Sequence, residues 1–223
     1  MHRYRKFIQS NLDFLLPYIA FILILIPAFI LIPKNTIHLF INSHHSLFAD
    51  YLFRYITCLG DGIVPFLIAT VLLFFSIRSS FYMALGGTLA GLTAQFFKRI
   101  VFPEIKRPVA VFNDIPGFHL IEGVDMNSAF SFPSGHAATI FAVCLILAGL
   151  TRNKGIKLVL FLVALIVGFS RVYLSQHFLI DYYAGSFLGV LSAIFVVGCF
   201  DQFGPEWMNK SVVIACKRRA WHE

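Results

Sequence analysis

The sequence predicts an all-α polytopic membrane protein, a bundle of six transmembrane helices in a single domain over residues 1–223. Of its 223 residues, 58% are hydrophobic and only 13% are charged. The mean hydropathy is +0.79, and long apolar stretches recur along the chain. Soluble domains carry more charge than this. We therefore expect the bilayer to be the main solvent of the fold.

The apolar stretches set the predicted spans. Each is about as long as a helix needs to cross the hydrocarbon core at a rise of ~1.5 Å per residue. The first follows a basic start, which also suits a signal peptide. Its length, Pro17, Pro27 and the lack of a small-residue cleavage pattern favour an uncleaved span. The six predicted spans cover residues 14–33, 61–77, 81–97, 134–150, 157–173 and 178–200.

The connections between the spans differ in character. Residues 34–60 mix apolar and polar side chains, which predicts one or two amphipathic helices in the membrane interface. Residues 78–80 are predicted to be a short turn. Residues 98–132 form one long polar loop, and a loop of that length in a compact bundle is usually functional. Glycines four residues apart predict close helix contacts in the third and sixth spans: Gly87 with Gly91, and Gly185 with Gly189.

Two groups of potential metal ligands are interpreted as structural. His44 and His45, with Asp50, form a possible metal cluster in the interfacial segment. Adjacent histidines point to different faces of a helix, so a segment wetted by water is the preferred interpretation. The cysteines form no CxxC pair and are expected to be small packing residues without metal or disulfide. A bridge between Cys58 and Cys216 is excluded by the predicted topology; the four cysteines are Cys58, Cys144, Cys199 and Cys216.

The charge distribution predicts the orientation. The chain has 18 Lys and Arg against 11 Asp and Glu, a net charge of +7. In a membrane protein this excess is typical of cytoplasmic loops, and no nucleic-acid-binding motif is present in the sequence. We expect both termini to lie on the cytoplasmic side of a bacterial inner membrane. The polar site then faces the periplasm or exterior. The inner segments then hold 11 of the 18 basic residues: Arg3, Arg5, Lys6, Arg78, Arg152, Lys154, Lys157, Lys210, Lys217, Arg218 and Arg219. The outer segments hold the remaining 7: Lys34, Arg54, Lys98, Arg99, Lys106, Arg107 and Arg171.

Residues 170–181 join two apolar segments, yet they carry Arg171, His177 and Asp181. Ionisable groups at the edge of membrane spans are costly and therefore indicate a functional site. In a helix, His177 and Asp181 are four residues apart and share one face. The carboxylate can then hold the imidazole in one tautomer and leave its other nitrogen free to attack or to accept a proton. The alternative is a His–Asp pair that only satisfies itself between packed helices.

Two further segments reach the same membrane face. Pro-Ser-Gly-His at residues 133–136 begins the fourth span, where free backbone amides and the helix dipole can face an anion. Gly135 also allows a close backbone approach. Lys98 and Arg107, with Arg171, supply positive charge for a phosphate. Together the three segments indicate a phosphate-handling site. The alternative interpretation is that these basic residues only set the membrane topology and that residues 133–136 are an ordinary helix start.

These segments resemble the three-part signature of the phosphatidic acid phosphatase type 2 superfamily, and the resemblance covers about residues 81–200. The family pattern is Lys, six residues, Arg-Pro; then Pro-Ser-Gly-His; then Ser-Arg, five residues, His, three residues, Asp. Residues 133–136 match its second part and residues 170–181 its third part in full.

The first part of the signature differs in spacing. Eight residues separate Lys98 from Arg107, and Ile100 stands at the usual lysine position. Lys98, at the end of the third span, is the preferred counterpart of the family lysine, and Arg99 is the alternative.

The resemblance implies a chemical role for each residue. His177, oriented by Asp181, would be the nucleophile and form a phosphohistidine, while His136 would protonate the leaving oxygen and then activate water. No carboxylate pair suited to Mg²⁺ appears in the sequence, so we expect catalysis without metal or cofactor. The residues expected to bind the phosphoryl oxygens are Lys98, Arg107, Ser134, Gly135 and Arg171.

The expected substrate is a lipid phosphate or diphosphate, because the site opens at the membrane interface. Undecaprenyl pyrophosphate, phosphatidylglycerol phosphate, phosphatidic acid and lipid A phosphates are candidates within the family, and His119, Glu122 and Asp125 of the polar loop would meet their head groups. One alternative is a phosphotransferase that passes the phosphoryl group from His177 to a lipid. Another is a non-catalytic transporter or binding protein for phosphate or lipid. The sequence does not predict the oligomeric state.

Overall fold

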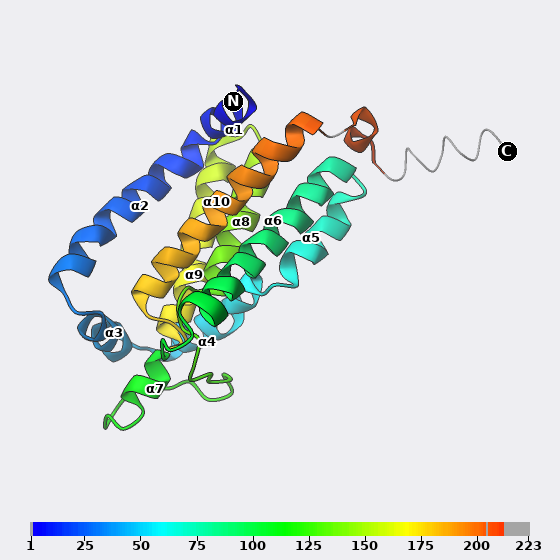
Figure 1. Cartoon of the computed structure of the whole chain (residues 1–223). Coiled ribbons are helices and arrows are strands. Elements are labelled where there is room, and N and C mark those ends of the chain that lie inside the picture. The colour runs from blue at the N-terminus through cyan, green and yellow to red at the C-terminus, as the bar shows by residue number, and fades with distance from the viewer. Residues whose placement is uncertain (1, 204, 212–223) are drawn as a thin grey trace.

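The computed structural model of the chain describes residues 2–203 and 205–211. Over these residues the chain is all-helical and contains no strand, as the sequence predicts. In chain order, the helices are α1 (His2–Ser10), α2 (Leu12–Leu31), α3 (Lys34–Ser43), α4 (Leu47–Ile56), η1 (Thr57–Gly60), α5 (Val64–Leu72), α6 (Ile77–Phe96), η2 (Phe97–Val101), α7 (Pro108–Phe112), α8 (Gly135–Leu150), α9 (Lys154–Tyr173), α10 (Leu179–Phe203) and η3 (Glu206–Asn209) (Figure 1).

Helix α8 is the centre of the bundle and packs against α6, α9 and α10. Most of its side chains are buried, including Phe141, Leu145 and Ile146. A helix that is apolar on every face is stable only where neighbours or lipid cover it on every side. The central position of α8 therefore follows from its sequence.

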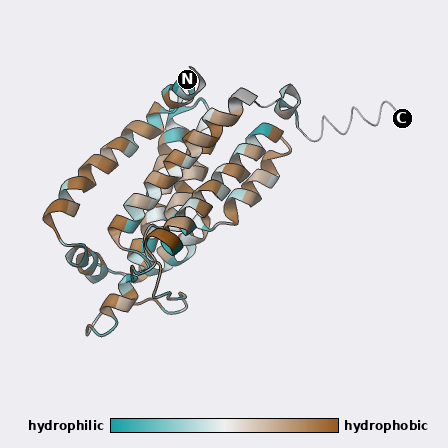
Figure 2. Cartoon of the chain, in the orientation of Figure 1, coloured by the Kyte–Doolittle hydropathy of each residue, from teal (hydrophilic) through white to brown (hydrophobic). Residues whose placement is uncertain are grey.

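The outer faces of the bundle are also apolar. Hydrophobic residues run along most of α2 (Figure 2), where Leu16, Leu23 and Ile30 are exposed. Soluble monomers rarely expose continuous apolar surface of this extent. The bundle therefore presents a lipid-facing surface.

Within the described part of the chain, three helices are long and apolar enough to cross a membrane: α2, α9 and α10. A fourth span results if Leu47–Gly60 and Val64–Leu72, which meet at an angle of 59°, are one broken span. Helix α8 is apolar but shorter. Each of the six predicted spans contains a helix, while the number that cross the bilayer stays a prediction.

The chain between α5 and α6 corrects the predicted turn at residues 78–80. These residues form the first turn of α6, and the chain turns earlier, just after α5. The cause is a helix cap: the Ser76 hydroxyl accepts a hydrogen bond from the Ser79 amide at 3.3 Å. Serine is among the preferred residues at this position, because its oxygen satisfies an amide that lacks a partner in the helix.

The two glycine pairs behave differently. A side chain on Gly185 would overlap the backbone carbonyl of Ser134, the N-cap of α8, and one on Gly189 would overlap that of Ala138 in α8. The predicted close contact of the last helix is therefore confirmed. In α6, a side chain on Gly87 would meet Pro65, but one on Gly91 would find no atom of another described element within 4 Å.

Gly185→Ala is expected to destabilise the bundle by about 1–3 kcal/mol, because the added methyl group forces α10 away from the start of α8. Gly91→Ala is the matched control. It adds the same methyl group where there is room and is expected to be neutral or slightly stabilising. The measurement is the thermal unfolding midpoint of each purified variant in detergent. Equal midpoints for the two variants would contradict the contact.

The two ends of the bundle differ. Helix α1 lies at one end, and α3, α4 and α7 lie at the other with the polar loop (Figure 1).

Three of the four cysteines lie in the described part of the chain. Cys58 is exposed, Cys144 is buried, and the Cys199 sulfur lies 2.7 Å from the Tyr4 hydroxyl. The remaining predictions for the tail fall outside the described residues: they concern Cys216, Lys217, Arg218 and Arg219.

Candidate active site

The turn between α9 and α10 brings the predicted His–Asp pair together, though not as the sequence suggested. Helix α10 begins only after His177, and the Phe178 carbonyl accepts the first helical hydrogen bond, from Tyr182 at 3.2 Å. The prediction that His177 and Asp181 share a helix face is therefore wrong. The turn itself folds the two side chains toward each other, with 3.5 Å between His177 Nδ1 and Asp181 Oδ2.

The Asp181 carboxylate is held by its own hydrogen bonds. Its Oδ2 accepts from the Ser131 hydroxyl at 2.5 Å and from the Phe178 amide at 2.9 Å. The distance to His177 is longer than a strong N–H···O bond, and His177 Nδ1 has no hydrogen-bond partner among the described residues. The carboxylate thus faces the imidazole from a fixed position. Ser131 was not predicted to be a residue of the site, because no motif distinguishes it from its neighbours in the sequence.

Burial and positive neighbours control the protonation of His177. The side chain is only 1% exposed, and burial, followed by Lys98 and Arg107, lowers its pKa well below the usual histidine value. The imidazole is therefore neutral at physiological pH and keeps a lone pair on one ring nitrogen. A buried, neutral imidazole beside a fixed carboxylate is suited to nucleophilic attack.

The start of α8 presents part of the predicted anion site. Ser134 is the N-cap residue, and its hydroxyl accepts from the Ala137 amide at 3.4 Å. Its own amide donates to the Asp181 carbonyl at 2.9 Å, so this amide is not among the free amides expected at the start of the helix. The amides of Gly135 and His136 lie in the first turn, where no helical acceptor exists. They are the amides that can face an anion.

His136 lies against the short helix η1. A β-carbon added at Gly60 would lie 3.1 Å from the His136 β-carbon and 3.2 Å from its ring. The absence of a side chain at Gly60 therefore makes room for the imidazole. Gly60 was not predicted to be a residue of the site.

A wide helical turn distinguishes Lys98 from Arg99. Helix α6 passes into η2, a π-helix over Phe97–Val101. Lys98 is 5% exposed there, whereas Ile100 is 67% exposed and Arg99 lies on the surface with its Nε bonded to Gln95 at 3.3 Å. A π-helix carries more residues per turn than an α-helix, which helps to absorb the longer spacing to Arg107. The structure thus favours Lys98 as the residue that faces the site.

The charge of Lys98 responds to its surroundings. Burial, followed by the nearby Arg107, lowers its pKa to about 7, while Asp181 acts in the opposite direction. Burial also lowers the pKa of Arg107. Because cations gather here with little exposure to solvent, an anion placed between them would be strongly favoured.

Gln176 joins the two arginines. Its Oε1 accepts from Arg107 Nη1 at 2.9 Å and from Arg171 Nη2 at 3.3 Å. Its Nε2 donates to the Asp125 carbonyl and to the Met126 sulfur, both at 2.9 Å. Gln176 is fully buried and was not predicted to be a residue of the site. Its position next to His177, in a segment enclosed by apolar helices, is the sequence feature that could have indicated its role.

The two guanidinium groups are only partly satisfied by the protein. Arg107 Nε donates to the Ala129 carbonyl at 2.9 Å, and Arg171 Nη1 donates to the Thr57 hydroxyl at 3.3 Å. Arg171 Nε is buried and finds no hydrogen-bond partner in residues 2–203 and 205–211. A buried donor of this kind suits an incoming oxyanion.

A cavity of about 290 Å³ leads to the cationic groups from the polar loop, with Lys98, Arg107 and Asn127 in its lining. Of the predicted head-group residues, Asp125 contacts Gln176 through its carbonyl. His119 lies elsewhere, beside Asp50. The structure therefore gathers the three predicted segments at one end of the bundle and places His119 in a different cluster.

The family model of the PAP2 superfamily matches residues 78–205, more than half of the chain. The chain is 36% identical over 84 residues to phosphatidylglycerophosphatase B of Bacillus subtilis (strain 168), a match that spans 34% of this chain but only 41% of that protein. It is 27% identical over 159 residues to undecaprenyl-diphosphatase BcrC of the same organism, which covers 70% of this chain and 75% of that protein.

Two solved structures share the fold. The crystal structure of Aquifex aeolicus LpxE superposes with a TM-score of 0.64 at 24% sequence identity, over 73% of this chain and 93% of that one. The first transmembrane PAP2 type phosphatidylglycerolphosphate phosphatase from Bacillus subtilis superposes with a TM-score of 0.60 at 21% identity, over 88% and 98%. The match to the family model, which contains all three signature segments, shows that this chain belongs to the PAP2 superfamily, the phosphatidic acid phosphatase type 2 superfamily.

Proposed function

We propose that this chain is an integral-membrane phosphatase that hydrolyses the phosphomonoester or diphosphate of a lipid. The observation that carries the proposal is the buried, neutral His177, which faces Asp181 at 3.5 Å next to Lys98, Arg107 and Arg171. Membership of the PAP2 superfamily supports it. So do the relatives, which are named as a phosphatidylglycerophosphatase and an undecaprenyl-diphosphatase.

The proposed reaction has two steps. A ring nitrogen of His177 attacks phosphorus, the N–P bond forms, the P–O bond to the lipid breaks, and His136 donates a proton to the leaving oxygen. His136 then removes a proton from water, which attacks the phosphohistidine, breaks the N–P bond and releases inorganic phosphate. Asp181 orients the imidazole and stabilises its positive charge. In this mechanism neither step requires a metal or other cofactor.

Positive charge stabilises the phosphoryl group throughout. Lys98, Arg107 and Arg171 bind its oxygens, together with the amides of Gly135 and His136. Each well-placed donor of this type typically contributes about 3–4 kcal/mol to the transition state. We propose that Ser134 acts through its cap and its bond to Asp181, which hold the start of α8 against α10.

We propose that residues 1–223 are one membrane-embedded domain with six spans and an interfacial helix α3. In this proposal both termini lie on the cytoplasmic side of a bacterial inner membrane, and the site faces the periplasm or exterior. The placement of α1 at the end of the bundle opposite the polar loop supports this orientation (Figure 1). The basic residues of the inner segments support it as well.

The proposed substrates are undecaprenyl pyrophosphate first, then phosphatidylglycerol phosphate and phosphatidic acid. The test is phosphate release from this panel by the detergent-purified protein in the presence of EDTA. Release from at least one lipid is expected in the presence of EDTA, because neither proposed step uses a metal. Transfer of the phosphoryl group to an added lipid without release would instead indicate a phosphotransferase. Binding of the lipids without either reaction would identify a non-catalytic protein.

Lys98→Arg is expected to shift the alkaline limb of the pH profile of kcat/KM to higher pH. An ammonium group is charged below its pKa, so Lys98 loses its charge as the pH rises through about 7 in the free enzyme. Arginine stays protonated through this pH range, because a guanidinium group is far more basic than an ammonium group. The measurement is kcat/KM against pH for wild type and variant on one short-chain substrate.

Arg99→Lys is the control for this comparison. Arg99 is exposed, and lysine keeps the positive charge that acts on Lys98 from this position, so the replacement should leave the profile unchanged. An identical alkaline limb in wild type and Lys98→Arg would exclude Lys98 as the group that titrates there.

A further inference from the structure

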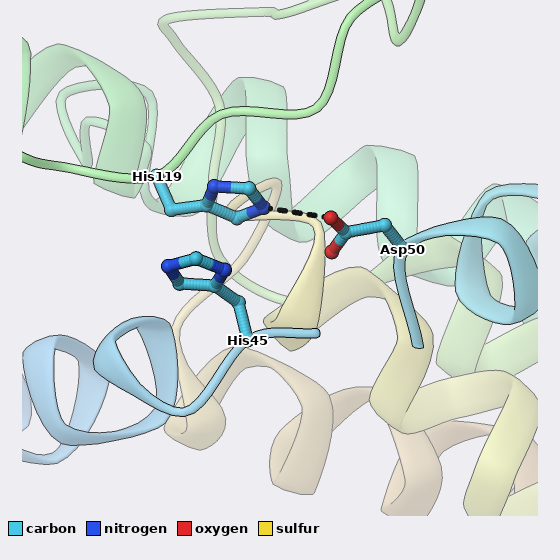
Figure 3. A group of neighbouring side chains, drawn as sticks. All are labelled: His45, Asp50 and His119. Atoms are coloured by element: carbon cyan, nitrogen blue, oxygen red, sulfur yellow. Dashed lines mark hydrogen bonds and ion pairs between the residues drawn. The ribbon is translucent and has the colours of Figure 1, made fainter. Parts of the chain in front are cut away.

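A second cluster of polar side chains lies apart from the proposed catalytic residues, at the corner between α3 and α4. Figure 3 shows His45, Asp50 and His119, which come from the α3–α4 turn, the first turn of α4 and the polar loop. His119 Nε2 lies 3.1 Å from Asp50 Oδ2. The rings of His45 and His119 stack with centroids 3.7 Å apart and planes within 6°. One ligand atom from each residue lies within 4.8 Å of the others.

Helix geometry does not disfavour a metal at this corner. His44 and His45 follow the end of α3 and lie in a turn, not on a helix. His44 bonds back to the Phe40 carbonyl at 2.7 Å, whereas His45 faces the polar loop. The chain thus brings the imidazole of His119, from the distant polar loop, to the imidazole and the carboxylate of the α3–α4 corner. His119 was expected at the substrate head group, and its position here is what completes the set.

The ligand types suit a divalent transition ion. Imidazole nitrogen and carboxylate oxygen bind Zn²⁺ at about 2.0–2.2 Å, and three protein ligands with water in the fourth position form a common tetrahedral site. Such ligand atoms lie roughly 3.3 Å apart around the ion, since their bonds meet at tetrahedral angles. The carboxylate and the His119 nitrogen already lie at 3.1 Å. His45 is exposed, and a ring nitrogen of His45 lies within 4.8 Å of the other two ligand atoms. A rotation of this side chain out of the ring stack would direct that nitrogen toward the ion.

Neighbouring residues hold two of the three ligands in place. Asp50 Oδ1 accepts from the Tyr173 hydroxyl at 2.6 Å. Asn42 bonds to both sides of the His119 backbone: its Nδ2 donates to the carbonyl at 2.8 Å, and its Oδ1 accepts from the amide at 3.0 Å. Asn42 is itself buried. Outer hydrogen bonds of this type fix metal ligands in their binding orientation.

Solvent can reach the cluster. Asp50 and His119 line a cavity of about 280 Å³. Arg54 and Glu122 also line it, and their opposite charges offset each other near the ion. An entry path of this kind is one of the requirements of a metal site.

We propose that His45, Asp50 and His119 bind a divalent transition ion of the Zn²⁺ class, and that the ion ties the polar loop to the α3–α4 corner. The same loop contacts Gln176 through Asp125 and Met126, so the ion would fix the segment that borders the phosphate-binding arginines. Its role is to hold the loop, separate from the proposed phosphoryl transfer.

The test is Zn²⁺ binding by the full chain, purified without a histidine tag, stripped with EDTA and desalted. Titration against a chelating dye is expected to show one bound equivalent in wild type. His45→Ala and His119→Ala are expected to lose it. His44→Ala is the matched control and is expected to keep it, because His44 bonds to Phe40 instead. A wild type that binds no equivalent, or alanine variants that keep it, would overturn the proposal.

A second variant tests direct coordination. In His45→Cys, a thiolate is expected to replace the imidazole, and Co²⁺ should then give a sulfur-to-metal charge-transfer band that wild type lacks. Glutamate-specific proteolysis after the exposed Glu122 should become slower with Zn²⁺ in wild type but not in His45→Ala. No new band, or no effect on proteolysis, would contradict the site or its role. None of these measurements uses a substrate, so failure of the proposed phosphatase activity would leave their outcome unchanged.

Discussion

His177→Gln is expected to lower phosphate release by a factor on the order of 10⁴ or more, because the amide has no ring nitrogen that can form the N–P bond. The side chain is buried in the turn before α10, and glutamine is small enough to occupy the same space. The measurement is the initial rate of phosphate release on the best lipid of the panel. His44→Gln, at an exposed histidine, should keep the wild-type rate.

The intermediate can be tested on the same proteins. Brief reaction with a lipid labelled in its phosphate should leave a label on wild type that survives alkali but not acid, as expected of a phosphohistidine. His177→Gln should carry no label. Phosphate release by His177→Gln at the wild-type rate would remove His177 as the nucleophile, whatever the substrate.

Arg171→Lys is expected to lower kcat/KM by about 10²–10³-fold, even though it keeps the positive charge. The guanidinium group donates to Gln176 and Thr57 from two nitrogens and has a third buried nitrogen available for a phosphoryl oxygen. An ammonium group cannot fill these three positions at once. The measurement is kcat/KM on the same lipid, with the unfolding midpoint of the variant as a check of its fold.

Arg152→Lys is the control for this substitution. Arg152 is exposed between α8 and α9, away from the proposed site, and its replacement should leave kcat/KM unchanged. A wild-type value in Arg171→Lys would show that charge alone, without the guanidinium geometry, is sufficient at this position.

The helices were predictable because each depends on a local pattern. Apolar stretches of sufficient length located the six helical regions, and Ser134 and Gly135 marked the start of α8 within one residue. The three signature segments were predictable for the same reason, since each is contiguous in sequence. Their convergence followed from placing them at the same ends of the spans.

The contacts within the site were not predictable, because they depend on tertiary structure. The Ser134 amide is occupied by the Asp181 carbonyl from another helix, which no local pattern reveals. Gln176 and Ser131 look like ordinary polar residues in the sequence, and only the fold shows what they hold. The spacing of the signature also could not identify the counterpart of the family lysine. The family spacing of six residues before Arg107 leads to Ile100, and the π-helix turns Ile100 outward.

The shared contact of Arg107 and Arg171 on Gln176 has a consequence for selectivity. Two guanidinium groups that meet on a neutral amide repel each other, and an anion between them relieves that repulsion in proportion to its charge. A terminal phosphate carries close to two negative charges at neutral pH, whereas the phosphodiester of an ordinary bilayer lipid carries one. The site would therefore discriminate by valence as well as by shape. In a membrane crowded with phosphodiesters, such a preference would keep the surrounding lipids from competing for the site.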